Sequence, residues 1–358
     1  MYVESMELFQ FRNIEHLKID LHPGTNLFWG DNAQGKTNIL EAVYLCGTTR
    51  SHRGAKDRDM IRLGQDESHI RMIINKGGMD GRIDFHLKKH KTKGIAVNGQ
   101  PIRRASDLLG LVSMVFFSPE DLNMIKNGPS ERRRFIDREL SQLDKVYLAD
   151  LAGYNKCLDQ RNHMLHEVSF RPDRSMELEI WDTQLAAYGE RVIDKRVRFI
   201  EEISPLVADI HSHLTGGKEK IELIYEPSAE PGHFLEKLER SRQSDIRQGT
   251  TTSGPQRDDL CVMINGMDAR SFASQGQQRT AALSMKLSEI ELVKKRIHDE
   301  PVLLLDDVLS ELDESRQDYL LDSIRDTQTL ITCTGIDDVT RSHFNIDRAY
   351  HISSGGIL

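Results

Sequence analysis

The amino-acid sequence predicts an α/β protein in which a head of strands and helices is interrupted by a long helical arm. Apolar runs of strand length, followed by helical patterns, occur near both ends of the 358-residue chain. In the middle of the chain, apolar residues instead recur every three or four positions, which is the period of an amphipathic helix. We therefore expect the N-terminal part of the head at residues 1–129, an inserted helical arm at residues 130–215, and the C-terminal part of the head at residues 216–358.

The composition argues against several classes of protein. Hydrophobic residues make up 38% of the chain and charged residues 29%, which is typical of a globular protein. No apolar run approaches the roughly 20 residues that span a bilayer, and the N-terminus lacks the pattern of a secretory signal. The net charge of -8 argues against a uniformly basic nucleic-acid-binding surface but allows a local one. The cysteines lack metal-ligand spacing, so we expect reduced thiols in a cytoplasmic protein: Cys46, Cys157, Cys261 and Cys333.

A phosphate-binding P-loop lies between an expected strand and an expected helix near the N-terminus. Its two glycines let successive backbone N–H groups point at an anion, and the helix N-terminus adds partial positive charge. Lys36 can then reach the β- and γ-phosphates of a nucleoside triphosphate, and the Thr37 hydroxyl can ligate Mg²⁺. The loop consists of Gly30, Asp31, Asn32, Ala33, Gln34, Gly35, Lys36 and Thr37.

Other elements of the N-terminal segment follow from alternating or continuous apolar runs. Asn98-Gly99 has the sequence of a hairpin turn. Strands are expected at residues 6–9, 17–20, 26–29, 69–74 and 82–87, and a helix at residues 39–45.

The arm is predicted from two helical patterns of similar length. The first opens near Ser130 and ends at Arg171-Pro172-Asp173, where proline stops it. The second extends from about Trp181 to Ile210. Two such helices joined by a short break predict an antiparallel pair. With about 30 residues in each, the pair would reach roughly 45 Å at about 1.5 Å per residue.

The C-terminal segment supplies a second set of phosphate- and metal-binding residues. An apolar strand at residues 301–307 ends in Asp306, which would bind Mg²⁺ as a Walker B acid, and Asp307, which could orient or deprotonate the attacking water. Upstream, residues 274–279 precede a helix and form an anion-binding tip, with an ordinary capped helix as the alternative. Because the P-loop already holds this chain's phosphates, we expect the tip to serve a nucleotide held by another copy.

The order of these motifs resembles the ABC-type ATPase heads of the SMC family, and most closely the RecF group within it. The resemblance rests on the P-loop, Ser274-Gln275-Gly276-Gln277-Gln278, the Walker B strand and Ser310-Glu311-Leu312-Asp313. It extends over essentially the whole chain and is weakest between about residues 160 and 245. Further similar stretches lie at residues 11–13, 117–122, 132–137 and 254–259.

The resemblance implies an ATP-dependent homodimer that holds DNA. Two heads would pair head-to-tail around two ATP molecules, and slow, DNA-stimulated hydrolysis would release single-stranded, gapped or junction DNA. It implies roles in recombinational DNA repair, replication, recombinase loading and the SOS response, with RecR and RecO as partners. It also assigns nucleotide contacts to Arg12, Asn13, Ser274, Gly276 and Gln277.

Several positions depart from related patterns. The tip has Gln275, and the Walker B strand has Asp307, where transporter ATPases usually have glycine and glutamate. The shorter carboxylate fits slow turnover. At the switch position Thr332 and Thr334 replace histidine, and Gln256 replaces a histidine expected in its motif.

Two questions stay open from the sequence. The runner-up function is the ATPase subunit of an ABC transporter; a GTPase or small-molecule kinase is disfavoured because no Asn-Lys-x-Asp motif is present. The candidate DNA contacts are basic residues that could equally form a solvated helix face: Arg132, Arg133, Arg134, Arg138, Arg191, Lys195, Arg196 and Arg198.

Overall fold

The computed structural model describes residues 1–335 and 345–358, and it divides into two compact units. The first comprises Met1–Asp121 and Glu289–Leu358, and the second comprises Leu122–Ser288. The second unit includes residues 216–288, which from the sequence are expected in the head. The two compact units thus do not coincide with the expected division into head and arm at residues 130 and 215, and this division stays a prediction.

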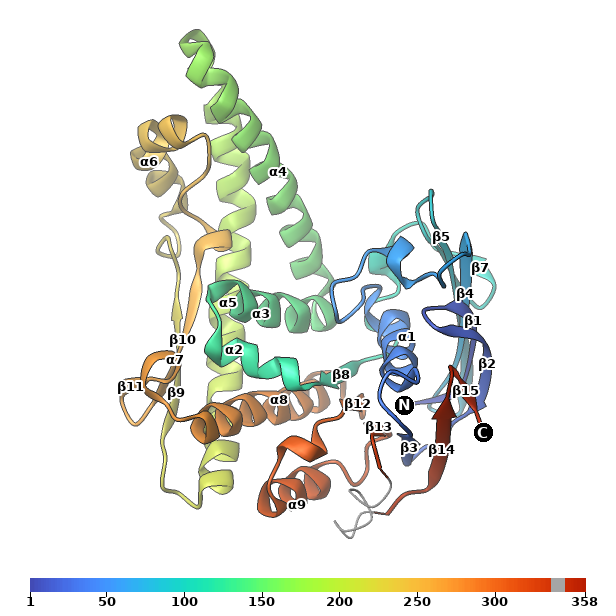
Figure 1. The fold of residues 1–358 in the computed structure, drawn as a ribbon. Helices are drawn as coiled ribbons and strands as arrows, with labels where there is room; N and C mark the ends of the chain where they lie inside the picture. Colours follow the sequence, from blue (N-terminus) through green and yellow to red (C-terminus); the bar gives the residue numbers. More distant parts are fainter. Residues whose placement is uncertain (336–344) are drawn as a thin grey trace. The chain divides into compact units, whose positions relative to one another are not determined.

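The described residues of the first unit form two six-stranded sheets (Figure 1). One is antiparallel, with the order β2-β1-β4-β5-β6-β7. The other has the order β15-β14-β3-β13-β12-β8, in which all neighbours except β14 and β15 are parallel. Their bounds are β1 Tyr2–Phe11, β2 Ile14–Asp20, β3 Thr25–Trp29, β4 Glu67–Lys76, β5 Met79–Lys88, β6 Gly94–Val97, β7 Gln100–Pro101, β8 Met114–Phe117, β12 Val302–Asp306, β13 Thr329–Cys333, β14 Arg348–Ser353 and β15 Gly356–Ile357.

One helix, α1 (Lys36–Thr48), contacts strands of both sheets and is buried along almost its whole length. Its apolar residues join those of the strands in one core, which accounts for the lack of a polar face in its sequence. The antiparallel sheet is buried on one side only: along β4, Ile70, Met72 and Ile74 are buried while the residues between them are not. Helix α9 (Glu314–Ser323) follows β12.

The second unit is built on two long helices that lie side by side, α4 (Lys145–Phe170) and α5 (Glu177–Thr215) (Figure 1). They have 26 and 39 residues, or roughly 39 and 58 Å at about 1.5 Å per residue. The predicted helical pair and its break at Arg171 are confirmed. The boundary between the two units falls within α8 (Gln275–Ile297). The other elements of the second unit are α2 Asn123–Lys126, α3 Pro129–Leu143, α6 Phe234–Gln248, α7 Ala269–Phe272, β9 Ile221–Glu226, β10 Asp259–Ile264 and β11 Met267–Asp268.

The first helical pattern of the arm forms two helices instead of one. Asp144 ends α3 and caps α4, because its carboxylate accepts hydrogen bonds from the backbone N–H groups of Val146 (2.8 Å) and Tyr147 (3.0 Å). Because apolar residues recur every three or four positions through both helices, the sequence pattern does not show that the helix ends at Asp144. Among the described residues, no helix is long and apolar enough to cross a membrane.

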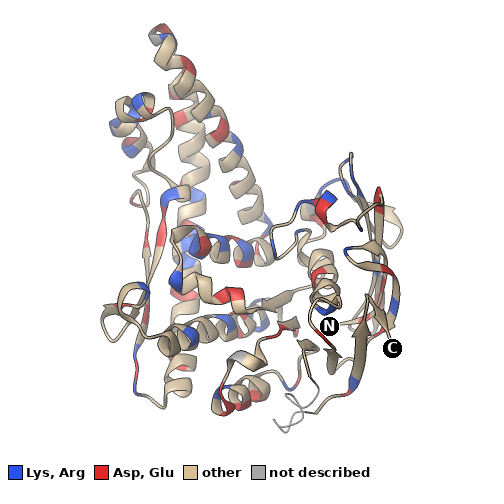
Figure 2. Cartoon of the chain, in the orientation of Figure 1, with Lys and Arg blue, Asp and Glu red and all other residues tan. Residues whose placement is uncertain are grey.

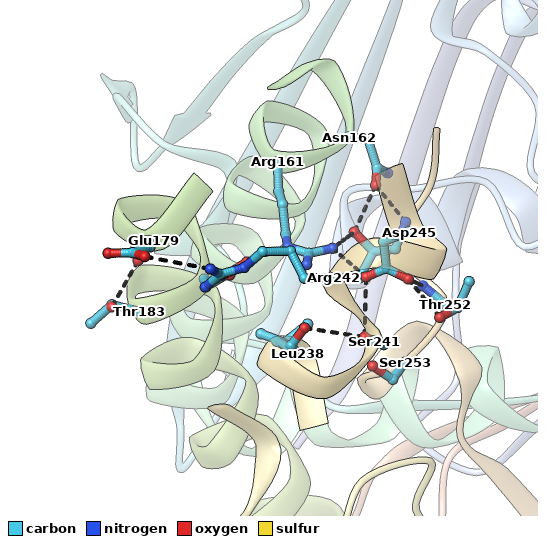
Figure 3. A network of polar contacts seen from close by, with 12 residues as sticks. Arg161, Asn162, Glu179, Thr183, Leu238, Ser241, Arg242, Asp245, Thr252 and Ser253 are labelled. Atoms are coloured by element: carbon cyan, nitrogen blue, oxygen red, sulfur yellow. Dashed lines mark hydrogen bonds and ion pairs between the residues drawn. The ribbon is translucent and has the colours of Figure 1, made fainter. Parts of the chain in front are cut away.

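A buried ionic network fastens α6 to the two long helices (Figure 3). Arg161 on α4 has no exposed surface and donates to Asp182 on α5 (2.6 Å) and to Asp245 on α6 (2.8 Å). Arg242 of α6 binds the other oxygen of Asp182 at 2.8 Å. The charges are compensated inside the unit, and removal of one partner would leave buried carboxylates without their counter-charge.

We expect Arg161→Ala to lower the free energy of unfolding of the second unit by about 3–5 kcal/mol, as for other broken buried ion pairs. Urea unfolding followed by Trp181 fluorescence in a Trp29→Phe background would measure this loss, since these are the 2 tryptophans of the chain. Arg240→Ala on the exposed face of α6 is the matched control, with an expected loss of about 0.5 kcal/mol or less. Equal losses in both variants would contradict the structural role of the network.

Candidate nucleotide site

The P-loop adopts the backbone conformation that its glycines permit. Gly30 has φ +142° and Gly35 has φ +113°, in the region that side chains rarely enter. A Cβ on Gly30 would lie 2.4 Å from the carbonyl oxygen of Ile352, and one on Gly35 would lie 2.9 Å from Oδ1 of Asn13. The loop therefore packs closely against its neighbours, and α1 begins at Lys36 as expected from the sequence.

Two turns brace this loop from outside. The side chain of Asn13, between β1 and β2, donates through Nδ2 to the carbonyl oxygen of Gln34 (3.1 Å). The backbone N–H of Gly355, between β14 and β15, donates to the same oxygen (2.9 Å), and the N–H of Ser354 donates to Oε1 of Gln34 (2.6 Å). Segments from both ends of the chain thus hold the loop, and Asn13 contacts it directly.

Lys36 is buried at the loop, with 7% of its surface exposed. Its ammonium donates to the carbonyl oxygens of Gly30 (2.6 Å) and Asp31 (2.8 Å). A cation is thereby fixed beside the backbone N–H groups of the loop and the N-terminus of α1. This combination favours a polyphosphate anion.

A cluster of two hydroxyls and one carboxylate joins three neighbouring parallel strands. Thr37 Oγ1 and Thr332 Oγ1 both donate to Oδ1 of Asp306, at 2.8 and 2.7 Å. The N–H of Asp307 donates to Thr332 Oγ1 at 3.0 Å. Because β3, β13 and β12 are adjacent and parallel, their carboxyl ends bring these residues together although Thr37 and Asp306 are 269 positions apart.

A buried glutamate beside the loop was not identified from the sequence. Glu41 on α1 has no exposed surface and accepts two hydrogen bonds from Arg12, at 2.8 Å from Nε and 2.7 Å from Nη2. Burial alone would raise the pKa of Glu41, but the bonds from Arg12 and Ser51 and the charge of Arg12 hold that pKa below its usual range. Arg12, predicted as a nucleotide contact, is thus an ion-pair partner of α1. The only feature of the sequence that indicates a buried ion pair here is the charge of Glu41 within an otherwise apolar stretch of the helix.

The tip residues Ser274, Gly276 and Gln277 belong to the second unit, at the start of α8. The backbone N–H of Ser274 donates to Oε1 of Gln277 (2.9 Å), and the N–H of Gln277 donates to Ser274 Oγ (3.3 Å). This reciprocal pair is a capping box. Ser274 and Gly276 are exposed, so an anion has access to the 23-residue helix's N-terminus.

Two of the candidate DNA contacts are buried, which corrects the expectation that they are accessible to DNA. Arg132 is 4% exposed and forms a two-pronged ion pair with Asp259 (2.7 and 2.9 Å). Arg196 is 2% exposed and binds Asp137 (2.8 Å) and Asp258 (3.0 Å). These arginines hold the second unit together and cannot reach a phosphate from inside it.

The remaining candidates differ in their environment. Basic and acidic residues are interspersed along α3 and α4 (Figure 2). Arg133 donates to the carbonyl oxygen of Asp258 (2.6 Å), and Lys195 pairs with Asp144 (2.5 Å). Arg138 is partly buried and pairs with Glu139 (3.0 Å). The exposed candidates are Arg134, Arg191 and Arg198.

The motif at residues 254–259 also has a structural role. Tyr154 of α4 donates a hydrogen bond to Oε1 of Gln256, while Nε2 of Gln256 donates to the carbonyl oxygen of Ser253 (3.0 Å). Asp258 is buried and accepts hydrogen bonds from Tyr225 and from the N–H of Ser228. The glutamine thus joins the motif to α4.

A P-loop at the end of a parallel strand, a carboxylate pair at the end of a nearby strand, an antiparallel sheet and a helical insertion define an ABC/SMC-type ATPase head. The family model described as the RecF/RecN/SMC N terminal domain matches residues 2–352. The chain belongs to the RecF family of DNA replication and repair proteins.

Similar proteins cover the full length of the chain. The DNA replication and repair protein RecF of Agathobacter rectalis is 55% identical over 357 residues, covering 100% of this chain and 99% of that protein. RecF of Lachnospira eligens is 55% identical over 360 residues, with the same coverage. These relatives give no support to the alternative of a transporter ATPase.

Solved structures agree with this assignment. The recombination mediator protein RecF-ATP in the RecFOR pathway has a TM-score of 0.94 and 36% identity, covering 100% of this chain and 97% of that one. The Smc head domain of Pyrococcus furiosus, bound to the C-terminal domain of ScpA, has a TM-score of 0.57 and 17% identity, covering 99% and 95%. The second likeness concerns the fold alone.

Proposed function

We propose that this protein is an ATP-gated DNA clamp of recombinational DNA repair and replication. The observation that carries the proposal is the hydrogen-bonded cluster of Thr37, Asp306 and Thr332 beside the P-loop. It brings the hydroxyl and the carboxylate that we propose to hold Mg²⁺ together beside the phosphate-binding loop. The solved RecF-ATP structure supports ATP as the nucleotide.

The oxygen pair at the P-loop fits Mg²⁺. Thr37 Oγ1 and Asp306 Oδ1 are 2.8 Å apart. An octahedral Mg²⁺ with bonds of about 2.0–2.1 Å separates neighbouring ligands by roughly 2.9 Å, so both oxygens can occupy adjacent positions around one ion. When bound, Mg²⁺ would neutralise charge on the β- and γ-phosphates. Lys36 would hold the same phosphates from the side of the loop.

Hydrolysis is proposed to be weak and to act as a switch. Asp307 follows the metal-binding Asp306 and is proposed to orient or deprotonate the attacking water. Its backbone has φ +55°, a left-handed conformation, and its N–H is tied to Thr332. The backbone position from which the Asp307 side chain extends is thereby fixed. Its carboxylate, however, extends less far toward the attacking water than that of a glutamate would. Slow hydrolysis would prolong the ATP-bound state, in which the protein is proposed to hold DNA.

ATP is proposed to join two copies of the chain. The exposed N-terminus of α8, with Ser274, Gly276 and Gln277, would bind the γ-phosphate of the ATP held by the other copy's P-loop. ATP and ADP differ by this phosphate, so only ATP would provide the contact. The dimer would hold single-stranded, gapped or junction DNA, with RecR and RecO as partners in recombinase loading and SOS induction. We propose the cytoplasm as its location.

Equilibrium binding to DNA with a single-strand/duplex junction tests the clamp. We expect tighter binding with ATP than with ADP, and an affinity that falls steeply as salt is added, because basic side chains release counterions from phosphates. In a triple variant Arg134→Glu, Arg191→Glu and Arg198→Glu, the ATP-dependent affinity should fall at least tenfold.

The matched control reverses three exposed basic residues of the first unit: Lys18→Glu, Lys89→Glu and Lys91→Glu. It should bind DNA as the wild type does. Equal binding with ATP and ADP would contradict the gating, and loss of binding in the control alone would place the DNA contacts in the first unit.

A further inference from the structure

Two histidines and a glutamate share the outer face of the antiparallel sheet, away from the nucleotide site. β4 and β5 pair with His69 opposite His86. Glu67 precedes His69 by two positions, so both side chains project from the same face of β4. The alternate residues Ile70 and Phe85 are buried in the core beneath. The two strands therefore hold the three polar side chains at fixed backbone positions on one face.

We propose that Glu67, His69 and His86 form a binding site for a transition-metal dication, for which Zn²⁺ is the best fit. One ligand atom from each of the three side chains lies within 4.8 Å of the other two. Nε2 of His86 is 2.7 Å from Oε2 of Glu67, and the two imidazole rings stack with their centroids 3.9 Å apart. Tetrahedral Zn²⁺ with bonds of about 2.0–2.1 Å separates its ligands by roughly 3.3 Å, so small side-chain rotations would admit the ion.

The donor set selects the kind of metal. Two imidazoles and one carboxylate suit Zn²⁺, Cu²⁺ or Ni²⁺, whereas Mg²⁺ and Ca²⁺ require mainly oxygen ligands. Three protein ligands leave one tetrahedral position for water.

The surface around the proposed site is hollow enough for a metal ion, and the two basic side chains nearby, Lys88 and Arg71, each form an ion pair with a carboxylate. The face forms a hollow of about 450 Å³ whose lining includes His69, His86 and His16. Lys88 lies 3.3 Å from Oε1 of Glu67, which leaves Oε2 toward His86. Arg71 is paired with Asp84 at 2.8 Å. Lys88 opposes a bound dication by like charge, so its removal should strengthen binding.

Calorimetric titration of the full-length, tag-free protein with Zn²⁺, without nucleotide or chelating buffer, tests the site. We expect one Zn²⁺ per chain at this site, with an affinity at least tenfold weaker in each of His69→Gln and His86→Gln. Lys88→Met should tighten binding several-fold. His16→Gln is the matched control, because His16 lines the same hollow and pairs with Glu7 (3.2 Å). It should leave the affinity unchanged.

A second readout separates metal binding from damage to the fold. Zn²⁺ should raise the Tm of the wild type and of His16→Gln but not of the double variant His69→Gln/His86→Gln, whose Tm without metal should match the wild type. Co²⁺ bound in place of Zn²⁺ should give the intense visible bands of a four-coordinate ion, and these should vanish in the double variant. Absence of saturable binding, or equal Zn²⁺ affinity in the wild type and the double variant, would overturn the proposal.

Discussion

Replacing Lys36 by alanine is expected to weaken ATP binding by about 10- to 150-fold. The ATP-dependent dimer should therefore no longer form at ATP concentrations in the millimolar range or below. Hydrogen bonds to charged groups contribute about 1.5–3 kcal/mol, which corresponds to this range of affinity. Lys36 is the buried cation at the loop, where its ammonium already donates to the carbonyl oxygens of Gly30 and Asp31. Alanine keeps the helix start but removes the charge that would meet the phosphates. Titration with a fluorescent ATP analogue would measure the loss.

Lys89→Ala provides the control for this experiment. Lys89 is an exposed lysine of the same unit, with a loose ion pair to Asp66 (3.7 Å). Its removal should leave the affinity for ATP unchanged. An unaltered affinity in Lys36→Ala, with the thermal stability preserved, would show that the P-loop lysine does not contact the nucleotide. The DNA clamp would then need another source of ATP dependence.

Local sequence encodes two parts of the candidate site, the P-loop and the end of the Walker B strand. The P-loop was recognisable because its spacing, its preceding strand and its following helix are contiguous. Asp306 was found because an apolar run ends there, and the parallel sheet then brings it to Thr37. The strands β8 and β14 were not predicted. β8 is only 4 residues long, and β14 is buried at few positions, so neither has a clear period.

Burial of charged residues could not be predicted from local sequence. Arg132 on α3 and Arg196 on α5 each lie among other basic residues of their helix, and from the sequence both are candidates for DNA contact. Their acidic partners Asp259 and Asp258 lie 127 and 62 positions away. Arg12 and Glu41 form a similar pair across 29 positions. Such pairs depend on tertiary packing, which decides whether an arginine faces solvent or a buried carboxylate.

The substitution Ser274→Arg is expected to eliminate ATP-dependent dimers while leaving ATP binding by the monomer nearly intact. Ser274 lies in the second unit, whereas Lys36 and Asp306 lie in the first. In the proposed dimer, its hydroxyl and the N–H groups behind it meet the γ-phosphate bound to the other copy. Arginine would place a long side chain at this contact and would also remove the capping hydroxyl. Sedimentation velocity with ATP and Mg²⁺ would resolve monomers from dimers.

Two companion variants separate these effects. Ser274→Ala removes the cap, at a cost of about 0.5–2 kcal/mol to the helix start, but adds no bulk. Ser169→Arg adds the same bulk and charge at an exposed serine near the end of α4. We expect weakened dimers in the first and normal dimers in the second. If Ser274→Arg formed dimers with ATP as the wild type does, α8 would not contact the other copy's nucleotide, and its capping box would serve only to start the helix.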